Sequence, residues 1–189
     1  TGIVNDTGWL QLTVGTESDT AENVDEVFVN TGAGNDSVLV TFDLLAPAIG
    51  LWLEGRAGDD TLVGGPASDF LYGGGGIDSL DGAGGDDTLF GGSGDDSLQA
   101  GDGNDYVLGT TGDDSVLAGA GNDTVLGGDG FDTILGEAGD DSIEGGSADD
   151  SIDGGGGLDT IVGGEGDDTI DGQANPDSIY GGLGNDVYL

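Results

Sequence analysis

The chain has 189 residues, a length that suits one domain or one elongated array, and carries 39 acidic residues against a single basic one, Arg56, for a formal net charge of −38. This charge excludes binding to nucleic acid and insertion into anionic membranes, and the absence of Cys, His and Lys excludes disulfides, thiolate metal sites and the usual general bases. With 44 Gly, the composition favours disorder unless a fixed period is present. The chain begins at Thr1 rather than Met and shows no signal peptide, so we expect a processed protein or an excerpt.

Residues 1–54 follow no nonapeptide register, but they contain short apolar alternations that predict strands. These apolar residues are Leu10, Leu12, Val14, Val27, Val29, Val38, Val40, Phe42, Ile49, Leu51 and Leu53. An 11-residue spacing relates Val29, Val40, Leu51 and Leu62, and it also relates Asp25 to Asp36. We therefore expect wider, less regular coils that lead into the repeats and cover their N-terminal end.

Two features of this segment leave alternatives open. Residues 31–39, TGAGNDSVL, form one isolated nonapeptide, and its Asp36 lacks a clear partner 18 residues away, so a metal ligand there stays undecided. Trp9 and Trp52 are expected as aromatic caps over an open core, with a carbohydrate platform as the alternative.

Residues 55–189 divide into fifteen nonapeptides of the pattern GGxGxDxUx, where U is apolar, without an insertion or deletion. The eighth position is Leu, Val or Ile in the first fourteen repeats and Tyr188 in the last. The sixth position is always Asp: Asp60, Asp69, Asp78, Asp87, Asp96, Asp105, Asp114, Asp123, Asp132, Asp141, Asp150, Asp159, Asp168, Asp177 and Asp186.

Each nonapeptide has a simple physical interpretation. Positions 1 to 6 form a Gly-rich loop, and positions 7 to 9 form a short strand whose eighth side chain points inward. One apolar side chain per repeat buries little by itself, so the copies must stack to make a continuous core, as in a solenoid.

These repeats resemble those of the repeats-in-toxin family over residues 55–189. The resemblance implies an all-β fold, a right-handed parallel β-roll or β-solenoid with 18-residue coils of two nonapeptides each. We expect residues 1–54 to be an irregular β-strand leader or N-terminal cap, and residues 55–189 to be the calcium-binding β-roll.

The resemblance also implies where Ca²⁺ binds, namely between loop n and loop n+2. One loop would offer the carbonyl groups of positions 2 and 4 with its Asp, and the other the carbonyl groups of positions 1 and 3 with its own Asp. One such set is Gly74, Gly76, Asp78, Gly91, Ser93 and Asp96. Further carbonyl ligands would come from Gly92, Gly94, Gly101, Gly103, Gly119, Gly121, Gly128 and Gly130.

Six oxygen ligands suit Ca²⁺, and fifteen repeats allow up to about thirteen ions. Loops that depart from the pattern are expected to hold distorted or empty sites: Pro66 with Ala67, Ala148, and Asn175 with Pro176. Asp and Gly could also serve only as turn formers. Turn chemistry would tolerate Asn or Ser at the sixth position, however, and that position is always Asp.

For function, we expect an extracellular or cell-surface calcium-binding structural protein of bacterial type, and not an enzyme. The acidic residues repeat identically, so no single carboxylate pair is marked for glycoside hydrolysis. An ice-binding solenoid is disfavoured because the third position is irregular, with one Thr, Thr111, in fifteen repeats. The alternative is a folding and secretion module of a larger secreted toxin, adhesin or hydrolase.

Self-association is expected from two features. Position 9 of the even repeats is apolar in six of seven cases, the residues being Tyr72, Phe90, Leu108, Leu126, Glu144, Val162 and Tyr180. Phe70 and Tyr106 lie beside them at position 7. Such an outward apolar stripe favours a partner or a second copy, and the last coil would leave an exposed strand edge. An apolar stripe that merely reflects strand propensity is the competing interpretation.

Overall fold

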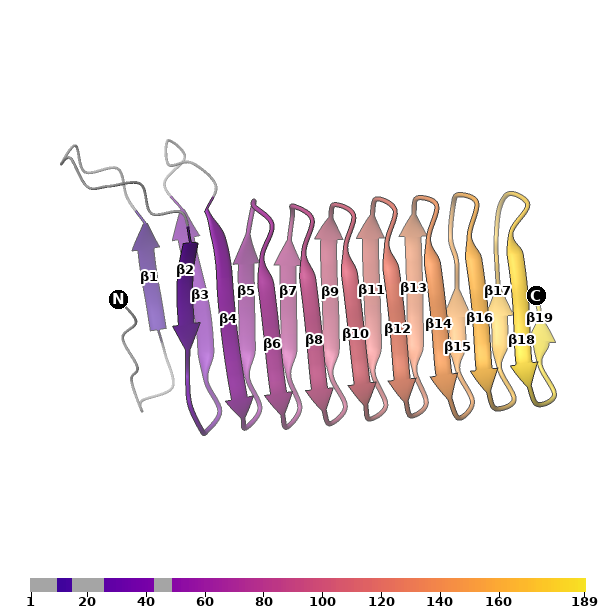
Figure 1. Cartoon of the computed structure of the whole chain (residues 1–189), viewed down its shortest axis with the longest axis horizontal. Coiled ribbons are helices and arrows are strands. Elements are labelled where there is room, and N and C mark those ends of the chain that lie inside the picture. The colour runs from indigo at the N-terminus through magenta and orange to yellow at the C-terminus, as the bar shows by residue number, and fades with distance from the viewer. Residues whose placement is uncertain (1–9, 15–25, 43–48) are drawn as a thin grey trace.

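The computed structural model describes residues 10–14, 26–42 and 49–189, which form parallel strands wound into one solenoid (Figure 1). Odd-numbered strands make a ten-stranded sheet, even-numbered strands make a nine-stranded sheet, and each strand pairs with the strand two places further along. In these ranges there is no helix long and apolar enough to cross a membrane. The predicted all-β solenoid is confirmed.

Most strands of the repeats have five or six residues, whereas the last three strands of the ten-stranded sheet have only two or three. The ten-stranded sheet contains β1 (Leu10–Val14), β3 (Ser37–Phe42), β5 (Thr61–Gly65), β7 (Ser79–Ala83), β9 (Ser97–Asp102), β11 (Ser115–Ala120), β13 (Thr133–Ala138), β15 (Ser151–Asp153), β17 (Thr169–Asp171) and β19 (Val187–Tyr188). The nine-stranded sheet contains β2 (Glu26–Asn30), β4 (Gly50–Ala57), β6 (Phe70–Gly75), β8 (Thr88–Ser93), β10 (Tyr106–Thr111), β12 (Thr124–Asp129), β14 (Ser142–Ser147), β16 (Thr160–Glu165) and β18 (Ser178–Leu183).

The strand register shows where the regular coils begin. From β4 onward, paired residues are two nonapeptides apart, as in Trp52 with Phe70, which confirms the 18-residue coil. Before β4 the coils are wider: β2 and β4 pair Val29 with Leu53, and β1 and β3 pair Leu10 with Val38. The expected wider coils are therefore present, but the 11-residue spacing is not their pairing register. The division after residue 54 falls inside β4 and stays a prediction.

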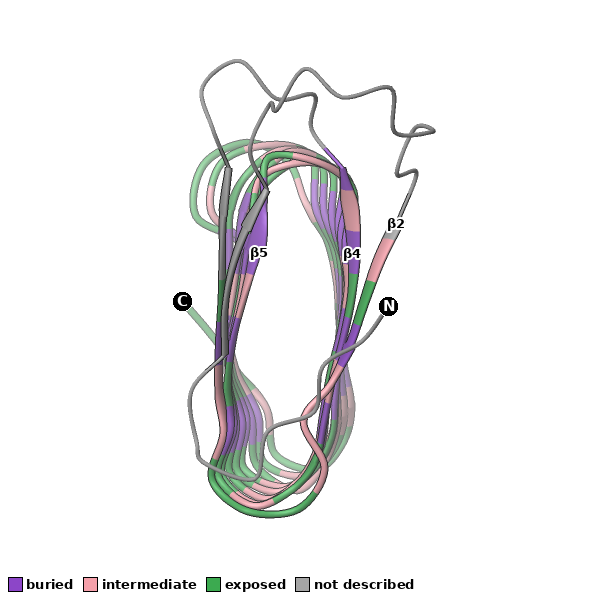
Figure 2. Ribbon diagram, turned by 90° about the vertical axis from the view of Figure 1, so that its left-hand side faces the viewer, coloured by how far each residue is buried: buried purple, intermediate pink, exposed green. Residues whose placement is uncertain are grey.

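The core is a ladder of single apolar side chains between the two sheets. The buried positions recur on both sheets from coil to coil (Figure 2). The position-8 residues from Leu62 to Ile170 are at most 2% exposed, whereas their position-7 neighbours point outward, as the strand alternation predicts. Ala100 and Ala118 are buried where other repeats have Gly at position 1. The core of each coil is thus only one side chain deep on each sheet.

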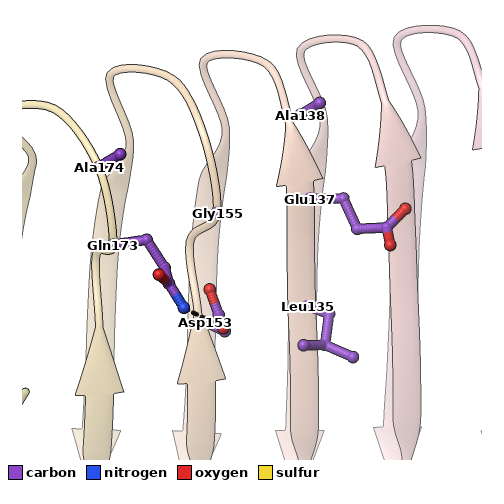
Figure 3. A pocket seen from close by; sticks show the side chains of 7 residues that line it. All are labelled: Leu135, Glu137, Ala138, Asp153, Gly155, Gln173 and Ala174. Atoms are coloured by element: carbon purple, nitrogen blue, oxygen red, sulfur yellow. Dashed lines mark hydrogen bonds between the residues drawn. The ribbon is translucent and has the colours of Figure 1, made fainter.

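The ten-stranded sheet has a hollow of about 540 Å³ where β15 and β17 are only three residues long (Figure 3). Beyond these strands the chain continues through single bridges, which pair Gly156 with Ala138 and with Ala174. Across the hollow, the Gln173 side-chain amide donates a hydrogen bond of 2.9 Å to the Asp153 carboxylate. The hollow therefore marks a local break in sheet pairing.

Trp52 does not cap the core. It lies on the outer face of β4, is 40% exposed, and contacts Phe28 and Phe70. The expectation of a cap is wrong for this residue, because strand alternation places its neighbours Leu51 and Leu53 inside instead. Trp9 and Asp25 lie outside the described residues.

Candidate metal centre

The sixth-position Asp residues form two columns, one along each edge of the solenoid. The loops that follow even-numbered strands carry Asp60, Asp78, Asp96, Asp114, Asp132, Asp150, Asp168 and Asp186, and the other column is Asp69, Asp87, Asp105, Asp123, Asp141, Asp159 and Asp177. From Asp60 to Asp168 every one is at most 4% exposed, and Asp177 and Asp186 are half-buried. Such buried carboxylates need compensation.

One oxygen of each carboxylate is satisfied by the neighbouring coil. The backbone N–H of each Asp donates to Oδ1 of the Asp 18 residues later, at 2.7–3.2 Å, and this links all thirteen n/n+2 pairs. In addition, Leu51 N–H donates to Asp69 Oδ1 at the start of one column. These bonds hold each carboxylate in the gap between two coils.

The other oxygen is buried and has no hydrogen-bond partner. This holds for Oδ2 of Asp60, Asp78, Asp87, Asp96, Asp105, Asp114, Asp123, Asp132, Asp141, Asp150, Asp159 and Asp168. A row of buried, unpartnered carboxylate oxygens is costly, because each has lost water without gaining a donor. Their regular recurrence fits the binding of a cation between successive coils.

Backbone carbonyl groups face the same gaps. A Cβ built on Gly92 or Gly94 would collide with the carbonyl oxygen of Gly74 or Gly76, so these two carbonyl groups point toward the next loop. In the opposite direction, Gly76 N–H donates to the Ser93 carbonyl oxygen at 2.9 Å. The Gly91 carbonyl oxygen and Asp78 Oδ2 both lie beside the point that a Cβ on residue 73 would occupy.

The loop backbone produces this arrangement through positive φ at positions 2 and 4. All ten glycines proposed as ligands at these positions adopt it, the residues being Gly74, Gly76, Gly92, Gly94, Gly101, Gly103, Gly119, Gly121, Gly128 and Gly130. Seven residues other than Gly have the same conformation at positions 2 or 4, namely Arg56, Ala83, Thr110, Glu137, Ala148, Gln173 and Asn175. Coil stacking therefore imposes the turn even where the side chain disfavours it.

The donor set fits Ca²⁺. In the proposed set, Asp78 Oδ2 lies with the Gly91 carbonyl oxygen beside residue 73, and Asp78 N–H donates to Asp96 Oδ1 across the gap. Carbonyl and carboxylate oxygens are the hard donors that Ca²⁺ prefers, so the set would suit this ion. Among the described residues there is no group of three or more Asp or Glu side chains placed to hold a metal ion.

Comparison with known families agrees with this donor set. The model of the RTX calcium-binding nonapeptide repeat family (4 copies) matches residues 52–80, 63–98, 81–116, 99–134, 126–161 and 153–188. The chain belongs to this family. Repeats of the RTX family bind Ca²⁺, and their β-roll is a structural calcium-binding domain. None of the curated proteins compared with the chain matches it significantly.

Without metal, the RTX fold raises the pKa of its buried carboxyl groups. Burial is the largest cause, followed by the opposing hydrogen bond from the preceding coil and by repulsion from neighbouring Asp residues. The pKa rises from 3.8 to about 8 at Asp87, to about 7 at Asp114, Asp141 and Asp150, and to about 6 at Asp60, Asp96 and Asp105. At neutral pH the charged columns therefore oppose folding.

This leads to an expected pH dependence. A folded pKa above the unfolded value means that the metal-free fold binds extra protons, so its stability is highest below about pH 4 and falls as pH rises toward 8. In calcium-free buffer, acidification from pH 8 to about 4.5 should increase β-structure, measured by far-UV circular dichroism. In millimolar Ca²⁺ the gain should vanish. A calcium-free spectrum that stays constant over this range would contradict the role assigned to the columns.

Asp36 extends one Asp column beyond the repeats. Its N–H donates to Asp60 Oδ1 at 2.8 Å, and its own Oδ2 is buried without a partner. This partner does not lie 18 residues away, because the coil between β3 and β5 is 24 residues long. In the same gap the Thr31 hydroxyl donates to the Gly55 carbonyl oxygen at 3.0 Å. The Thr31 side chain thus contacts a position-1 carbonyl group, which the repeat pattern proposes as a Ca²⁺ ligand.

The loop containing Pro66 and Ala67 differs from the others. Neither Gly65 nor Ala67 adopts the positive φ found at the same positions elsewhere. Asp69 Oδ2 instead accepts a 2.6 Å hydrogen bond from Gly65 N–H in its own loop. By contrast, Ala148 and Asn175 retain the positive φ and so preserve the loop backbone.

The sequence analysis did not identify a second ladder of polar side chains on the surface. Position 5 is Asp or Asn in ten of fifteen repeats, a signal present in the sequence. Its side-chain oxygen accepts from the position-5 N–H of the next coil, as in Asp140 N–H to Asn122 Oδ1 at 2.8 Å. This exposed ladder donates in the opposite direction to the buried one. It is present at nine of the thirteen junctions between 18-residue coils, which are therefore hydrogen-bonded through both position 5 and position 6.

Proposed function

We propose that this chain is an extracellular structural protein whose folding is driven by Ca²⁺ and whose calcium-loaded form self-associates. The supporting observation is the row of buried, unpartnered Asp Oδ2 atoms facing carbonyl oxygens in successive gaps. Thirteen linked Asp pairs would hold up to thirteen ions. A catalytic role is not part of the proposal, because the carboxylates repeat identically and their free oxygens face metal positions.

The energetics support calcium as the driving force. An 18-residue coil buries two position-8 side chains, worth about 1.5–3 kcal/mol each. Ordering its backbone costs about 1–2 kcal/mol per residue. Ladder hydrogen bonds return only about 1 kcal/mol each. A divalent ion between two stacked carboxylates converts their repulsion into attraction, so the free energy of binding becomes free energy of folding.

An extracellular location follows from the expected affinity. Sites that must fold as they bind lose part of the binding free energy to chain ordering, which lowers the apparent affinity. Extracellular calcium modules typically work at about 10⁻⁴–10⁻³ M Ca²⁺. A calcium titration with a midpoint in this range, followed by circular dichroism, would support the location. A midpoint below about 10⁻⁷ M, the range of cytosolic buffers, would oppose it.

Self-association would use the apolar stripe on the nine-stranded sheet. Tyr72, Phe90, Leu108 and Leu126 lie in register on adjacent strands β6, β8, β10 and β12. Loading thirteen ions would reduce the formal charge from −38 to about −12 and so remove most of the repulsion between copies.

We expect oligomers in millimolar Ca²⁺ by size-exclusion chromatography with light scattering. Replacing Tyr72, Phe90, Leu108 and Leu126 with Asp should give a monomer, because four charges would be buried at the contact. Calcium-induced folding should remain, since these side chains lie outside the core. If the wild-type protein stays monomeric at high concentration, the role as a folding and secretion module of a larger secreted protein takes the place of self-assembly.

A further inference from the structure

A ladder of aromatic rings crosses the outer face of the nine-stranded sheet. Phe28, Trp52, Phe70, Phe90 and Tyr106 come from β2, β4, β6, β8 and β10, and successive ring centroids are 6.1, 4.4, 5.4 and 6.1 Å apart. Trp52 and Phe28 are 40% and 50% exposed. None of these rings belongs to the core or to a metal gap, so folding and calcium binding do not account for them.

The rings line a groove of about 560 Å³, a volume within the range of small-molecule sites. Its lining residues are Phe28, Trp52, Glu54, Phe70, Tyr72 and Phe90, of which Glu54 alone is charged. The Glu54 carboxylate is held in place by a 2.7 Å hydrogen bond from the Asn30 side-chain amide. Its other oxygen lies 3.4 Å from Nε of Arg56, which is largely exposed.

Charge decides which kind of ligand this groove favours. Aromatic faces are electron-rich and attract cations, and the attraction is strongest for Trp. The surrounding chain has 39 acidic residues and one basic residue, so an anionic ligand is repelled from a groove that contains Glu54. Ca²⁺ prefers oxygen cages such as the loop gaps and does not compete for aromatic rings.

We propose that this groove binds an organic cation, with a methylated or alkyl ammonium group against Trp52, Phe70 and Tyr72 and beside the Glu54 carboxylate. The ligand contacts are apolar and electrostatic, and they need no change in the backbone. The groove lies at the N-terminal end of the self-association stripe and shares only Tyr72 and Phe90 with it. Because Trp52 and Glu54 lie outside the stripe, variants at these two residues test the groove separately from oligomer formation.

The test uses choline and 3,3-dimethylbutan-1-ol, which have nearly the same shape but differ in charge. Titration into the calcium-loaded chain is followed by broadening of the ligand methyl proton resonances. We expect choline to bind at least about threefold more tightly than the neutral alcohol, and more weakly as salt is added. Equal affinity for the two probes, or no saturable choline binding, would overturn the proposal. Saturable binding of a neutral oligosaccharide without choline binding would replace the cation with a sugar.

Variants locate the site. Trp52→Leu should abolish choline binding and Glu54→Gln should weaken it severalfold, because they remove the best ring and the counter-charge. Arg56→Gln should strengthen it, because Glu54 loses its competing partner. Tyr180→Leu, on the same sheet at β18, is the matched control and should change nothing. Circular dichroism of the same samples in Ca²⁺ separates loss of binding from loss of folding, and unchanged affinity in Trp52→Leu would refute the location.

Discussion

Removal of calcium should unfold most of the repeat region. The expected far-UV spectrum is that of a largely disordered chain in chelator at pH 7.5 and of a β-rich protein in millimolar Ca²⁺. The cause is the stacking of Asp residues in neighbouring coils, whose backbones are about 4.8 Å apart. At an effective dielectric constant of about 20, each charged pair repels by roughly 3 kcal/mol. A few such pairs already match the 5–15 kcal/mol that stabilises an ordinary domain.

Two controls separate metal coordination from screening. NaCl at the same ionic strength weakens repulsion between exposed charges but supplies no ion to a buried gap, so it should restore little β-structure. Mg²⁺ should also act poorly, because it demands short octahedral contacts and gives up water reluctantly. The metal-driven account is falsified if exhaustive chelation leaves the spectrum unchanged.

Substitution of Asp123 should remove about two bound ions and divide the solenoid. This residue lies in mid-column: its N–H donates to Asp141 Oδ1, and its own Oδ1 accepts from Asp105 N–H, each at 2.8 Å. It therefore takes part in two gaps. Asp123→Ala should lower the calcium stoichiometry by about two, measured by equilibrium dialysis, and should split one thermal transition into two, because coils couple only to their neighbours.

Matched variants identify the cause. Asp123→Asn keeps an acceptor for Asp105 N–H but lacks the charge, so it should lose calcium almost as fully as Asp123→Ala. Asn122→Ala removes only an exposed hydrogen bond in the outer ladder and should keep the stoichiometry. Asp36→Ala affects a single gap and should cost at most one ion. Equal losses in Asp36→Ala and Asp123→Ala would show that the column assignment is wrong.

The repeat sequence predicts the coil well because each nonapeptide specifies its own loop, strand and inward side chain. Fifteen copies without insertion keep Asp above Asp, so the 18-residue pairing follows directly. Because the coils stack so regularly, the φ angle at each loop position is set by the neighbouring coils and not by the residue that occupies it. Thr110 and Glu137 adopt the positive φ of position 2 because the coils on both sides require it.

The N-terminal coils were less predictable, because no repeat there signals the register. The pairing of Val29 with Leu53 spans 24 residues, and apolar spacing carries no information about how many residues separate two paired strands. For the same reason the partner of Asp36 was missed. The groove around Trp52 was also missed, because it assembles side chains from β2, β4, β6 and β8, and strand propensity alone explains each of them singly.

With folding driven by calcium as proposed, the parallel stacking of coils would make the molecule's length depend on calcium. Each folded coil advances the solenoid by only about 4.8 Å along its axis. The same 18 residues released as an extended chain span up to about 60 Å, at roughly 3.3–3.6 Å per residue. Loss of the ions would therefore allow the repeats to lengthen about twelvefold at full extension. Rebinding of the ions would shorten them again and pull together any two groups attached to the two ends of the chain.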